Sequence, residues 1–250
     1  LTPPSGSGSM SGMSNNGVAG YYSGGITKTG NMSTSDKLSY ATDTFTALKK
    51  ALSQQTQAPS SISNSGTAGY VAAGSGPTFA NSSIIDKITY STDTTTTLSA
   101  TTSVAAYGMP SASNGSTAGY ICATVASNID KLSFSTETRS TFGNNSIPVG
   151  TYIGAAENIG SAAYFSRDTQ ASWTKLSFST DTVSQISATL SSGTNFPTSA
   201  NVSNFGKNGY IFYDSITFQD KLSFSTEITS AISVGSTTGY SLPSSFSNNS

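Results

Sequence analysis

The stretch Asp86-Lys-Ile-Thr-Tyr-Ser-Thr-Asp93 decides the fold, because the chain contains five versions of it. Its lysines are separated by 50, 44, 44 and 46 residues and are Lys37, Lys87, Lys131, Lys175 and Lys221. A Gly-Tyr motif, replaced by Ala-Tyr in the fourth unit, precedes every copy, with tyrosines at Tyr21, Tyr70, Tyr120, Tyr164 and Tyr210. One unit of about 44–50 residues is therefore repeated five times, a period typical of propeller blades and longer than that of most solenoid coils.

Within each unit, apolar and polar residues alternate as in a half-buried strand. In the third copy, Leu132 and Phe134 point to one face, while Lys131 and the intervening serines point to the other. A Ser-Thr-Asp/Glu-Thr turn follows this strand, and an Asn/Gly turn preceded by a Ser-rich strand comes before the Gly-Tyr strand. Four short antiparallel strands per unit predict a propeller blade.

The composition supports an all-β chain and excludes several kinds of site. Ser and Thr total 86 of 250 residues, charged residues make up 9%, and the net charge is −1. Many aromatic and β-branched residues at near-zero net charge are the reverse of a disordered chain. The chain has no His and a single Cys, Cys122, which excludes His-based triads, His-bearing zinc sites and an internal disulfide. We expect no metal and no cofactor, and we expect Cys122 to be a buried thiol without a catalytic role.

The same composition limits the partners. The chain has no basic cluster, so we expect no nucleic-acid partner. It has no apolar run near the 18 or so residues of a membrane span, so we expect no membrane insertion.

We predict a single all-β propeller domain over residues 1–250. Its five four-stranded blades are predicted at about 7–52, 58–102, 110–146, 150–190 and 198–233. The first strand has two candidates, since residues 7–14 and 242–250 both have its character. Residues 234–250 are therefore predicted either to start a further first strand or to close the ring.

The repeat resembles the kelch-type blade. In the second copy, Gly69-Tyr-Val-Ala-Ala-Gly74 is followed by a variable loop and then by Asp86-Lys-Ile-Thr-Tyr-Ser-Thr-Asp-Thr94. It is similar in particular to the degenerate kelch-like repeats of structural and tail-fibre proteins of marine and cyanobacterial phages. The Gly pair of the family is kept only at Gly24-Gly25, and the late Trp of a kelch blade is absent. The resemblance implies a propeller of five kelch-like blades in a virion or appendage protein.

The charges of the repeat are predicted to be structural, because a catalytic pair is needed once and these charges recur in every blade. We expect the lysines to meet a carboxylate or carbonyl between blades and the turn acids to cap tight turns. The turn acids are Asp43, Asp93, Glu137, Asp181 and Glu227. Glu157, Asp168 and Asp214 lie outside the motif, one to a loop, and we expect them to be solvated loop acids.

Two motif matches do not carry chemistry. Ser166-Arg-Asp-Thr-Gln-Ala-Ser-Trp173 resembles the Asp box of sialidase propellers, but it occurs once, before the wrong strand, and the chain has only two Arg, whereas sialidases hold their substrate carboxylate with three. Ser172 and Lys175 match the Ser-x-x-Lys spacing of penicillin-recognising enzymes, but that motif belongs on a helix and here the Lys lies in a strand. We therefore predict no catalytic residue.

The aromatic residues fall into two groups. Ten of them fill two columns of the repeat and are predicted to pack within or between blades; the second column is Tyr40, Tyr90, Phe134, Phe178 and Phe224. Six of the others are predicted to lie in connections of variable length at one end of the propeller, where binding residues are often found. These candidate ligand-binding residues are Phe79, Tyr107, Trp173, Phe196, Tyr213 and Phe218.

The sequence favours a non-enzymatic structural or adhesive module at the surface of a virion or cell, or otherwise extracellular. Its expected partners are other structural subunits of the assembly and a host-surface glycan. The alternatives are a dedicated lectin, which requires a sugar site repeated in each blade, and a propeller hydrolase. A low-charge surface rich in Ser and Thr has little long-range electrostatic field, which suits assembly better than steered capture of a substrate.

Overall fold

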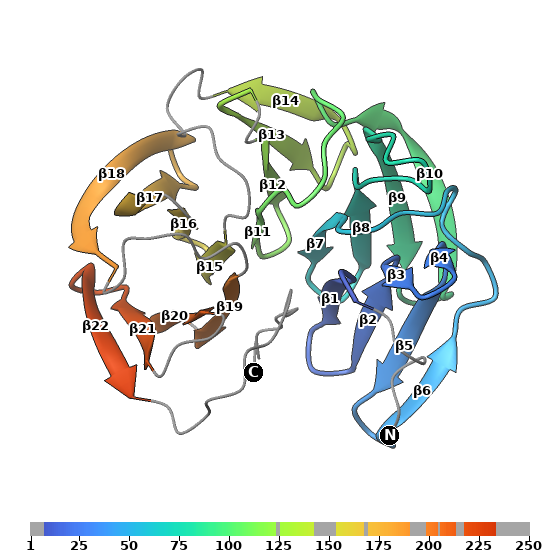
Figure 1. The fold of residues 1–250 in the computed structure, drawn as a ribbon, viewed down its shortest axis with the longest axis horizontal. Coiled ribbons are helices and arrows are strands. Elements are labelled where there is room, and N and C mark those ends of the chain that lie inside the picture. The colour runs from blue at the N-terminus through green and yellow to red at the C-terminus, as the bar shows by residue number, and fades with distance from the viewer. Residues whose placement is uncertain are drawn as a thin grey trace.

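Each repeat folds into one four-stranded antiparallel sheet, and the five sheets are arranged as the blades of a propeller (Figure 1). The computed structural model describes residues 8–123, 126–142, 154–167, 170–190, 199–204, 206–213 and 218–233. Strands and turns account for the ordered elements in these ranges, and none of the ranges contains a helix. The predicted five-bladed, all-β propeller is therefore confirmed.

The blades follow one another in chain order. Blade 1 contains β1 (Ser11–Asn15), β2 (Ala19–Ser23), β5 (Ser35–Ser39) and β6 (Thr44–Ala47), and a hairpin of β3 (Ile26–Thr27) and β4 (Gly30–Asn31) lies between β2 and β5. Blade 2 contains β7 (Ser60–Asn64), β8 (Ala68–Ala72), β9 (Ile84–Thr89) and β10 (Thr94–Thr101). Blade 3 contains β11 (Ser111–Asn114), β12 (Ala118–Ala123), β13 (Asn128–Ser133) and β14 (Arg139–Phe142). Blade 4 contains β15 (Gly154–Asn158), β16 (Ala162–Arg167), β17 (Gln170–Ser177) and β18 (Thr182–Thr189). Blade 5 contains β19 (Ser199–Asn204), β20 (Asn208–Tyr213), β21 (Phe218–Ser223) and β22 (Ile228–Ser233).

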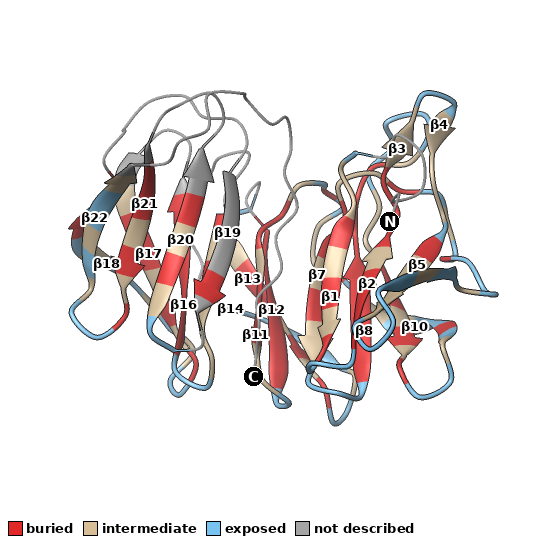
Figure 2. Cartoon of the chain, turned by 90° about the horizontal axis from the view of Figure 1, so that it is seen from below, coloured by how far each residue is buried: buried red, intermediate tan, exposed pale blue. Residues whose placement is uncertain are grey.

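Burial changes from strand to strand across a blade (Figure 2). The Gly-Tyr strands β8 and β12 are buried at every position, because neighbouring blades cover both of their faces. The third strands alternate over part of their length, as β13 does with buried Asp130 and Leu132 on either side of half-buried Lys131. The outermost strands are largely exposed, as in β14. The core is therefore a set of layers between blades.

The glycine of the Gly-Tyr motif is required by close packing between blades. A Cβ built on Gly119 would meet Cδ1 of Ile62, from the inner strand of the preceding blade, at 2.1 Å. In blade 4, Ala163 takes the place of the motif glycine. The residue of blade 3 that it faces is Ala112, which is equivalent to Ile62 of blade 2. A smaller side chain on one blade thus accompanies the larger one on the next, as close packing requires.

The two ends of the propeller differ in their connections. At one end, the first and second strands are joined by short turns, in which the Asn64 carbonyl accepts a hydrogen bond from Thr67 N at 2.8 Å and Gly66 has a positive φ of 74°. The turns between the third and fourth strands lie at this end too. Longer connections, including the β3–β4 hairpin, occupy the opposite end (Figure 2). No helix in the described ranges is long and apolar enough to cross a membrane.

Candidate functional site

The longer connections of the first three blades form one continuous surface, which we call the loop face. It consists of residues 24–34, 53–59, 73–83 and 102–110. Backbone hydrogen bonds join these loops to one another: Gly25 N to Thr56 O at 2.8 Å, Gln57 N to Ser75 O at 2.9 Å, and Gly74 N to Ala106 O at 2.8 Å. Loops tied together in this way give a pre-organised surface on a rigid scaffold.

Phe79 is the most conspicuous residue of the loop face. Its side chain is 77% exposed, and its backbone has a φ of 59°. A bulky residue in left-handed backbone is uncommon and costs free energy, and an exposed phenyl ring recovers none of that cost by burial. The turn is nonetheless closed, because Phe79 N donates to Gly76 O at 3.0 Å. The chain therefore holds an aromatic ring out into solvent at a fixed place.

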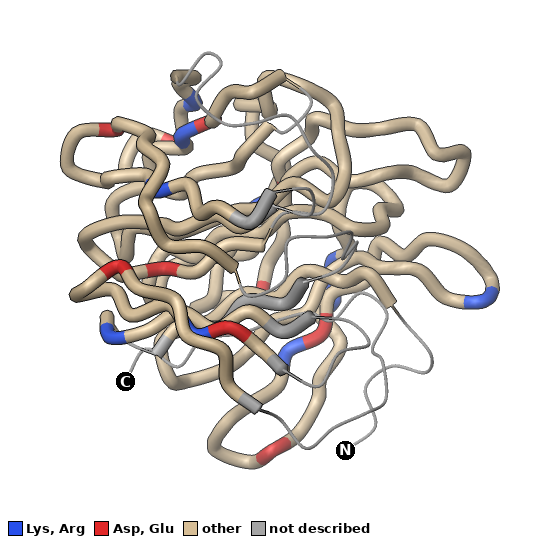
Figure 3. The backbone as a smooth tube through the Cα atoms, turned by 60° about the vertical axis from the view of Figure 1, so that its left-hand side comes forward, with Lys and Arg blue, Asp and Glu red and all other residues tan. Residues whose placement is uncertain are grey.

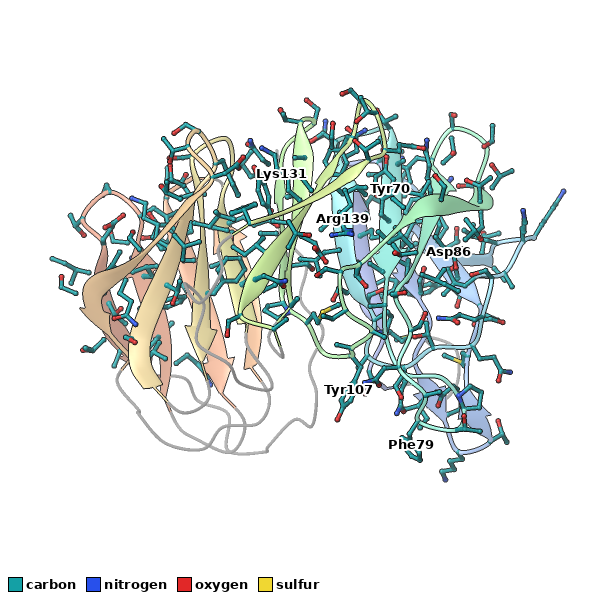
Figure 4. The ribbon with its side chains drawn as sticks, turned by 90° about the horizontal axis from the view of Figure 1, so that it is seen from above. Tyr70, Phe79, Asp86, Tyr107, Lys131 and Arg139 are labelled. Carbon is teal, nitrogen blue, oxygen red and sulfur yellow. The ribbon has the colours of Figure 1, made fainter. Side chains whose placement is uncertain are left out.

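Tyr107 lies at the same end of the propeller (Figure 4). It is 43% exposed, on the connection between blades 2 and 3. The neighbouring Gly108 N donates to Ala58 O at 2.8 Å, which anchors this connection to the loop before blade 2. Two of the six predicted binding residues are thus exposed at one end of the molecule.

The prediction that Trp173 lies on an exposed connection was wrong. Trp173 is part of β17, is 0% exposed, and packs against residues of the core between blades 4 and 5, including Ile211 and Leu222. Its indole Nε1 donates to Thr229 Oγ1 at 3.0 Å. Burial of a large ring with its one polar atom satisfied identifies Trp173 as a core residue.

The other three candidates are not placed as side chains. Phe196 lies outside the described residues. Tyr213 ends β20 and Phe218 begins β21, but the described part of the chain does not include their side chains. Asp168 and Asp214 also fall outside the described ranges.

The lysines and turn acids of the repeat meet between blades. At each of four junctions, a Tyr and a Lys paired across the second and third strands of one blade bind the turn carboxylate of the next blade. The tyrosine ring also stacks on the aromatic residue at the end of the next blade's third strand. We call this four-residue group the junction cassette. The four cassettes are Tyr21, Lys37, Tyr90 and Asp93; Tyr70, Lys87, Phe134 and Glu137; Tyr120, Lys131, Phe178 and Asp181; and Tyr164, Lys175, Phe224 and Glu227.

The third cassette shows the geometry. Lys131 Nζ lies 2.6 Å from Asp181 Oδ2, and the Tyr120 hydroxyl donates to Asp181 Oδ1 at 2.9 Å. The rings of Tyr120 and Phe178 are stacked with centroids 5.0 Å apart, and Lys131 Nζ lies 5.6 Å from the Tyr120 centroid. One carboxylate oxygen therefore contacts a cation and the other accepts a hydrogen bond from a phenol, and both partners come from the preceding blade.

The cassettes change the acidity of their members in the expected directions. Burial, followed by the negative charge of Glu137 and the hydrogen bond to it, raises the pKa of Tyr70 to about 12. The hydrogen bond from Lys175 lowers the pKa of Glu227 below its ordinary value of 4.5. Neither change poises a group for proton transfer near neutral pH, which is consistent with a structural role for the cassettes.

The turn acids occupy left-handed backbone, with φ between 52° and 53° in all five copies. Within the described residues, the carboxylates of Asp93, Glu137, Asp181 and Glu227 accept hydrogen bonds from the preceding blade and none from their own turn. The turn itself is closed by other groups, as when Glu137 N donates to Ser133 O at 2.8 Å. The prediction that the turn acids cap their own turns was therefore wrong at these four positions, where each turn places its carboxylate against the preceding blade.

The first Asp of the repeat has a separate role that the sequence analysis did not assign. Asp86 is buried and accepts hydrogen bonds from Ser53 N at 2.9 Å, Ser53 Oγ at 2.8 Å and Thr97 Oγ1 at 2.7 Å. Asp130 similarly accepts a hydrogen bond from Ser103 N at 2.6 Å. These aspartates thus fix the connection that enters their blade. Figure 3 shows the charged residues spread over the molecule, with the two signs intermixed.

A second series of contacts joins the inner strands of consecutive blades. We call this series the inner belt. In it, the backbone N–H of one strand donates to the side-chain oxygen of the equivalent residue in the next blade, over Ser14, Ser63, Ser113, Glu157 and Ser203. Four of these residues are serines and one is an acid. The donors and acceptors are 2.6–3.1 Å apart.

The prediction that Glu157 is a solvated loop acid was therefore wrong. It lies on β15, and its Oε1 accepts a hydrogen bond from Ser113 N at 2.6 Å. Burial raises the pKa of Glu157 from 4.5 to about 7, against the opposing effect of this hydrogen bond. The repeat does contain the signal, because Glu157-Asn158 aligns with Ser63-Asn64 and its equivalents.

Cys122 is fully buried on β12, and burial raises its pKa well above the ordinary value. Within the described ranges, no group of three acidic, Cys or His residues is placed to hold a metal ion.

Comparison with known proteins identifies the fold. No protein-family model and no curated protein sequence matches the chain. Among solved structures, the structure of YjhT is similar with a TM-score of 0.67 at 14% sequence identity, over 84% of this chain and 73% of YjhT. At this identity, the likeness supports the propeller fold alone.

Proposed function

We propose that the chain is a non-enzymatic recognition module of a virion or cell surface, in which the loop face carrying Phe79 and Tyr107 contacts a glycan. The observation that carries this proposal is Phe79, which is 77% exposed in left-handed backbone on a loop that hydrogen bonds hold in place. Strain of this kind is often found at functional sites. Exposed aromatic rings suit stacking on the apolar faces of sugars.

The rest of the molecule supports a scaffold role. The repeated Lys and acidic residues are engaged in the cassettes at four junctions, so they are not free to form a sugar site in each of those blades. A glycan site on the loop face is therefore favoured over the repeated sites of a lectin. The cassettes and the inner belt hold the blades, and none of their residues belongs to the loop face.

The proposal is tested by applying the labelled chain to an array of neutral and acidic glycans. Phe79→Ala and Tyr107→Ala each remove one exposed ring of the loop face. Tyr40→Ala is the matched control, because Tyr40 is 40% exposed at the opposite end of the propeller. We expect Phe79→Ala to weaken glycan binding at least tenfold and Tyr40→Ala to leave it unchanged.

Two results would overturn the proposal. One is an array on which no glycan binds the unmodified chain. The other is binding that Phe79→Ala and Tyr40→Ala reduce equally. Either result would leave the loop face as a contact for a neighbouring structural subunit.

A further inference from the structure

Five blades carry the parts of five junction cassettes, of which four are assembled within the described residues. In the described part of the chain, Lys221 of blade 5 has no carboxylate partner and Asp43 of blade 1 has no cation. The same two blades hold Tyr210 and Tyr40, which take no part in the stacked pairs that join the other blades. Blade 5 therefore presents the donor half of a cassette, Tyr210 and Lys221, and blade 1 presents the acceptor half, Tyr40 and Asp43.

Exposure separates these residues from their equivalents. Tyr40 is 40% exposed, whereas the rings at its position in the other four blades are 4–5% exposed. Tyr210 is half-buried, whereas the tyrosines at its position in the other blades are fully buried. Asp43 is exposed, whereas the other turn acids are half-buried. The donor half on blade 5 and the acceptor half on blade 1 are therefore more exposed than the same positions at the four assembled junctions, where a neighbouring blade covers them.

Both halves already have the conformation that the complete cassettes have. Asp43 has a φ of 52°, within a degree of the other turn acids, and the Thr42 and Thr44 hydroxyls lie 2.7 Å apart, as do those of Thr92 and Thr94. Tyr210 is paired across the sheet with Lys221, as Tyr120 is with Lys131. Little further ordering is needed for either half to bind, which favours association.

The two halves do not meet each other in this structure. Inner strands of consecutive blades pack together from β1 to β7, β11, β15 and β19, and in the described residues no comparable packing joins β19 to β1. Figure 1 shows the blades of β21–β22 and β5–β6 set farther apart than other neighbouring blades.

We propose that Tyr210 and Lys221 on blade 5 and Tyr40 and Asp43 on blade 1 form a docking site for one further β-blade of the same repeat. The turn acid of that blade binds Lys221 and the Tyr210 hydroxyl, and its aromatic ring stacks on Tyr210. On its other side, the blade supplies a Lys and a Tyr that bind Asp43, and this Tyr stacks on Tyr40. One blade with both halves of a cassette satisfies both surfaces.

A second copy of this chain fits less well. Its blade 1 would satisfy blade 5 of the first copy, but it would leave blade 1 of the first copy unmatched. Such a head-to-tail contact generates a ring of copies or an open filament. Direct pairing of Lys221 with Asp43 within one chain would satisfy both charges, but it requires blades 5 and 1 to approach until they touch. The experiment separates these possibilities.

The test compares the 250-residue chain with the same chain extended after Ser250 by a copy of residues 58–102, which form blade 2. Tethering gives the added blade a high effective concentration at the site. The matched control extension carries Asp93→Asn and Tyr90→Ala in the added copy only, which removes the two groups meant for blade 5. The measurement is the rate of lysine acetylation at each position, followed by mass spectrometry.

In the 250-residue chain, we expect Lys221 to react several-fold faster than Lys175, which is held in a cassette. The extension should slow Lys221 to the rate of Lys175, and the control extension should not. Asp43→Asn should lower the melting temperature of the extended chain by several degrees and leave that of the 250-residue chain unchanged.

Three results would overturn the proposal. The first is a monomeric 250-residue chain in which Lys221 is already as slow as Lys175, which means that blade 5 meets blade 1 directly. The second is slowing of Lys221 that grows with protein concentration together with a doubled mass, which means that a second copy is the partner. The third is an extended chain in which Lys221 stays fast.

Discussion

Glu227 and Glu157 belong to neighbouring blades, and the structure treats their carboxylates in opposite ways. Glu227 sits in a junction cassette, where Lys175 and the Tyr164 hydroxyl bind it, and its pKa is lowered. Glu157 sits in the inner belt, where its carboxylate accepts a hydrogen bond from the Ser113 backbone N–H, and burial raises its pKa to about 7. The difference shows that the surroundings set the direction of the pKa shift: hydrogen bonds from a lysine and a phenol favour the ionised form of Glu227, whereas at Glu157 the effect of burial exceeds that of the Ser113 N–H.

The comparison also separates two ways of joining blades. The inner belt needs one hydrogen-bond acceptor per blade, which a Ser hydroxyl provides without charge. A carboxylate at that position gains little and must be desolvated. The cassette combines an ion pair with a stacked ring, so it contributes through both charge and apolar burial.

The largest expected effect follows from the ring of the cassette. Tyr164→Ala removes the stack on Phe224 and the donor to Glu227, and should lower the free energy of unfolding by roughly 3–4 kcal/mol, as for other buried aromatic truncations. Tyr210→Ala is the matched control, since Tyr210 makes neither contact within the described residues, and should cost about 1 kcal/mol or less. Urea unfolding followed by circular dichroism measures both. Equal losses in the two variants would mean that the cassette adds nothing to burial in the strand.

Glu157→Gln should have the next largest effect, and its sign depends on pH. Because the pKa in the folded state is raised from 4.5 to about 7, the folded protein binds the extra proton between these values, and its stability falls as the pH rises through them. A Gln keeps the acceptor for Ser113 N and never ionises. At 1.36 kcal/mol for each pKa unit, the variant should be more stable than the unmodified protein by up to about 3 kcal/mol at pH 8, and equal to it near pH 4.

The measurement is the midpoint of urea unfolding from pH 4 to pH 8. Ser63→Ala removes an uncharged acceptor of the same belt, and its effect should not change with pH. A Glu157→Gln variant that is less stable than the unmodified protein at pH 8 would mean that the carboxylate has a stabilising partner when ionised.

Most of the architecture could be predicted from the sequence, because the repeat carries it. The Lys and Gly-Tyr motifs gave the number of blades and the strands in each, and alternation such as that of Leu132 and Phe134 gave the buried face. The two aromatic columns were predicted to pack within or between blades, and eight of their ten rings stack in pairs across the junctions.

The failures came where one residue departs from the repeat. Trp173 looks like a loop residue because no other blade has a Trp there, but β17 begins before it and carries it into the core. Glu157 was placed in a loop because its own blade has no Ser-Asn pair to mark the strand. The exposure of Phe79 was predicted from its loop, but its left-handed backbone depends on hydrogen bonds that the local sequence does not specify.

The smallest expected effect concerns the charge of the cassette alone. Glu227→Gln keeps the size of the side chain and removes the ion pair with Lys175, and should lower stability by roughly 0.5–1 kcal/mol at pH 7, because the pair is partly solvated. Since the pKa of Glu227 is lowered on folding, this contribution is present above pH 4.5 and is lost as the pH falls through the lowered value. Its pH dependence is therefore opposite to that of Glu157.

The control is Asp43→Asn, since the Asp43 carboxylate has no cation in the described residues. This variant should change stability by less than the error of a thermal melt. If Asp43→Asn costs as much as Glu227→Gln, the turn acids stabilise their own turns, and the contrast between the two glutamates does not depend on the lysine.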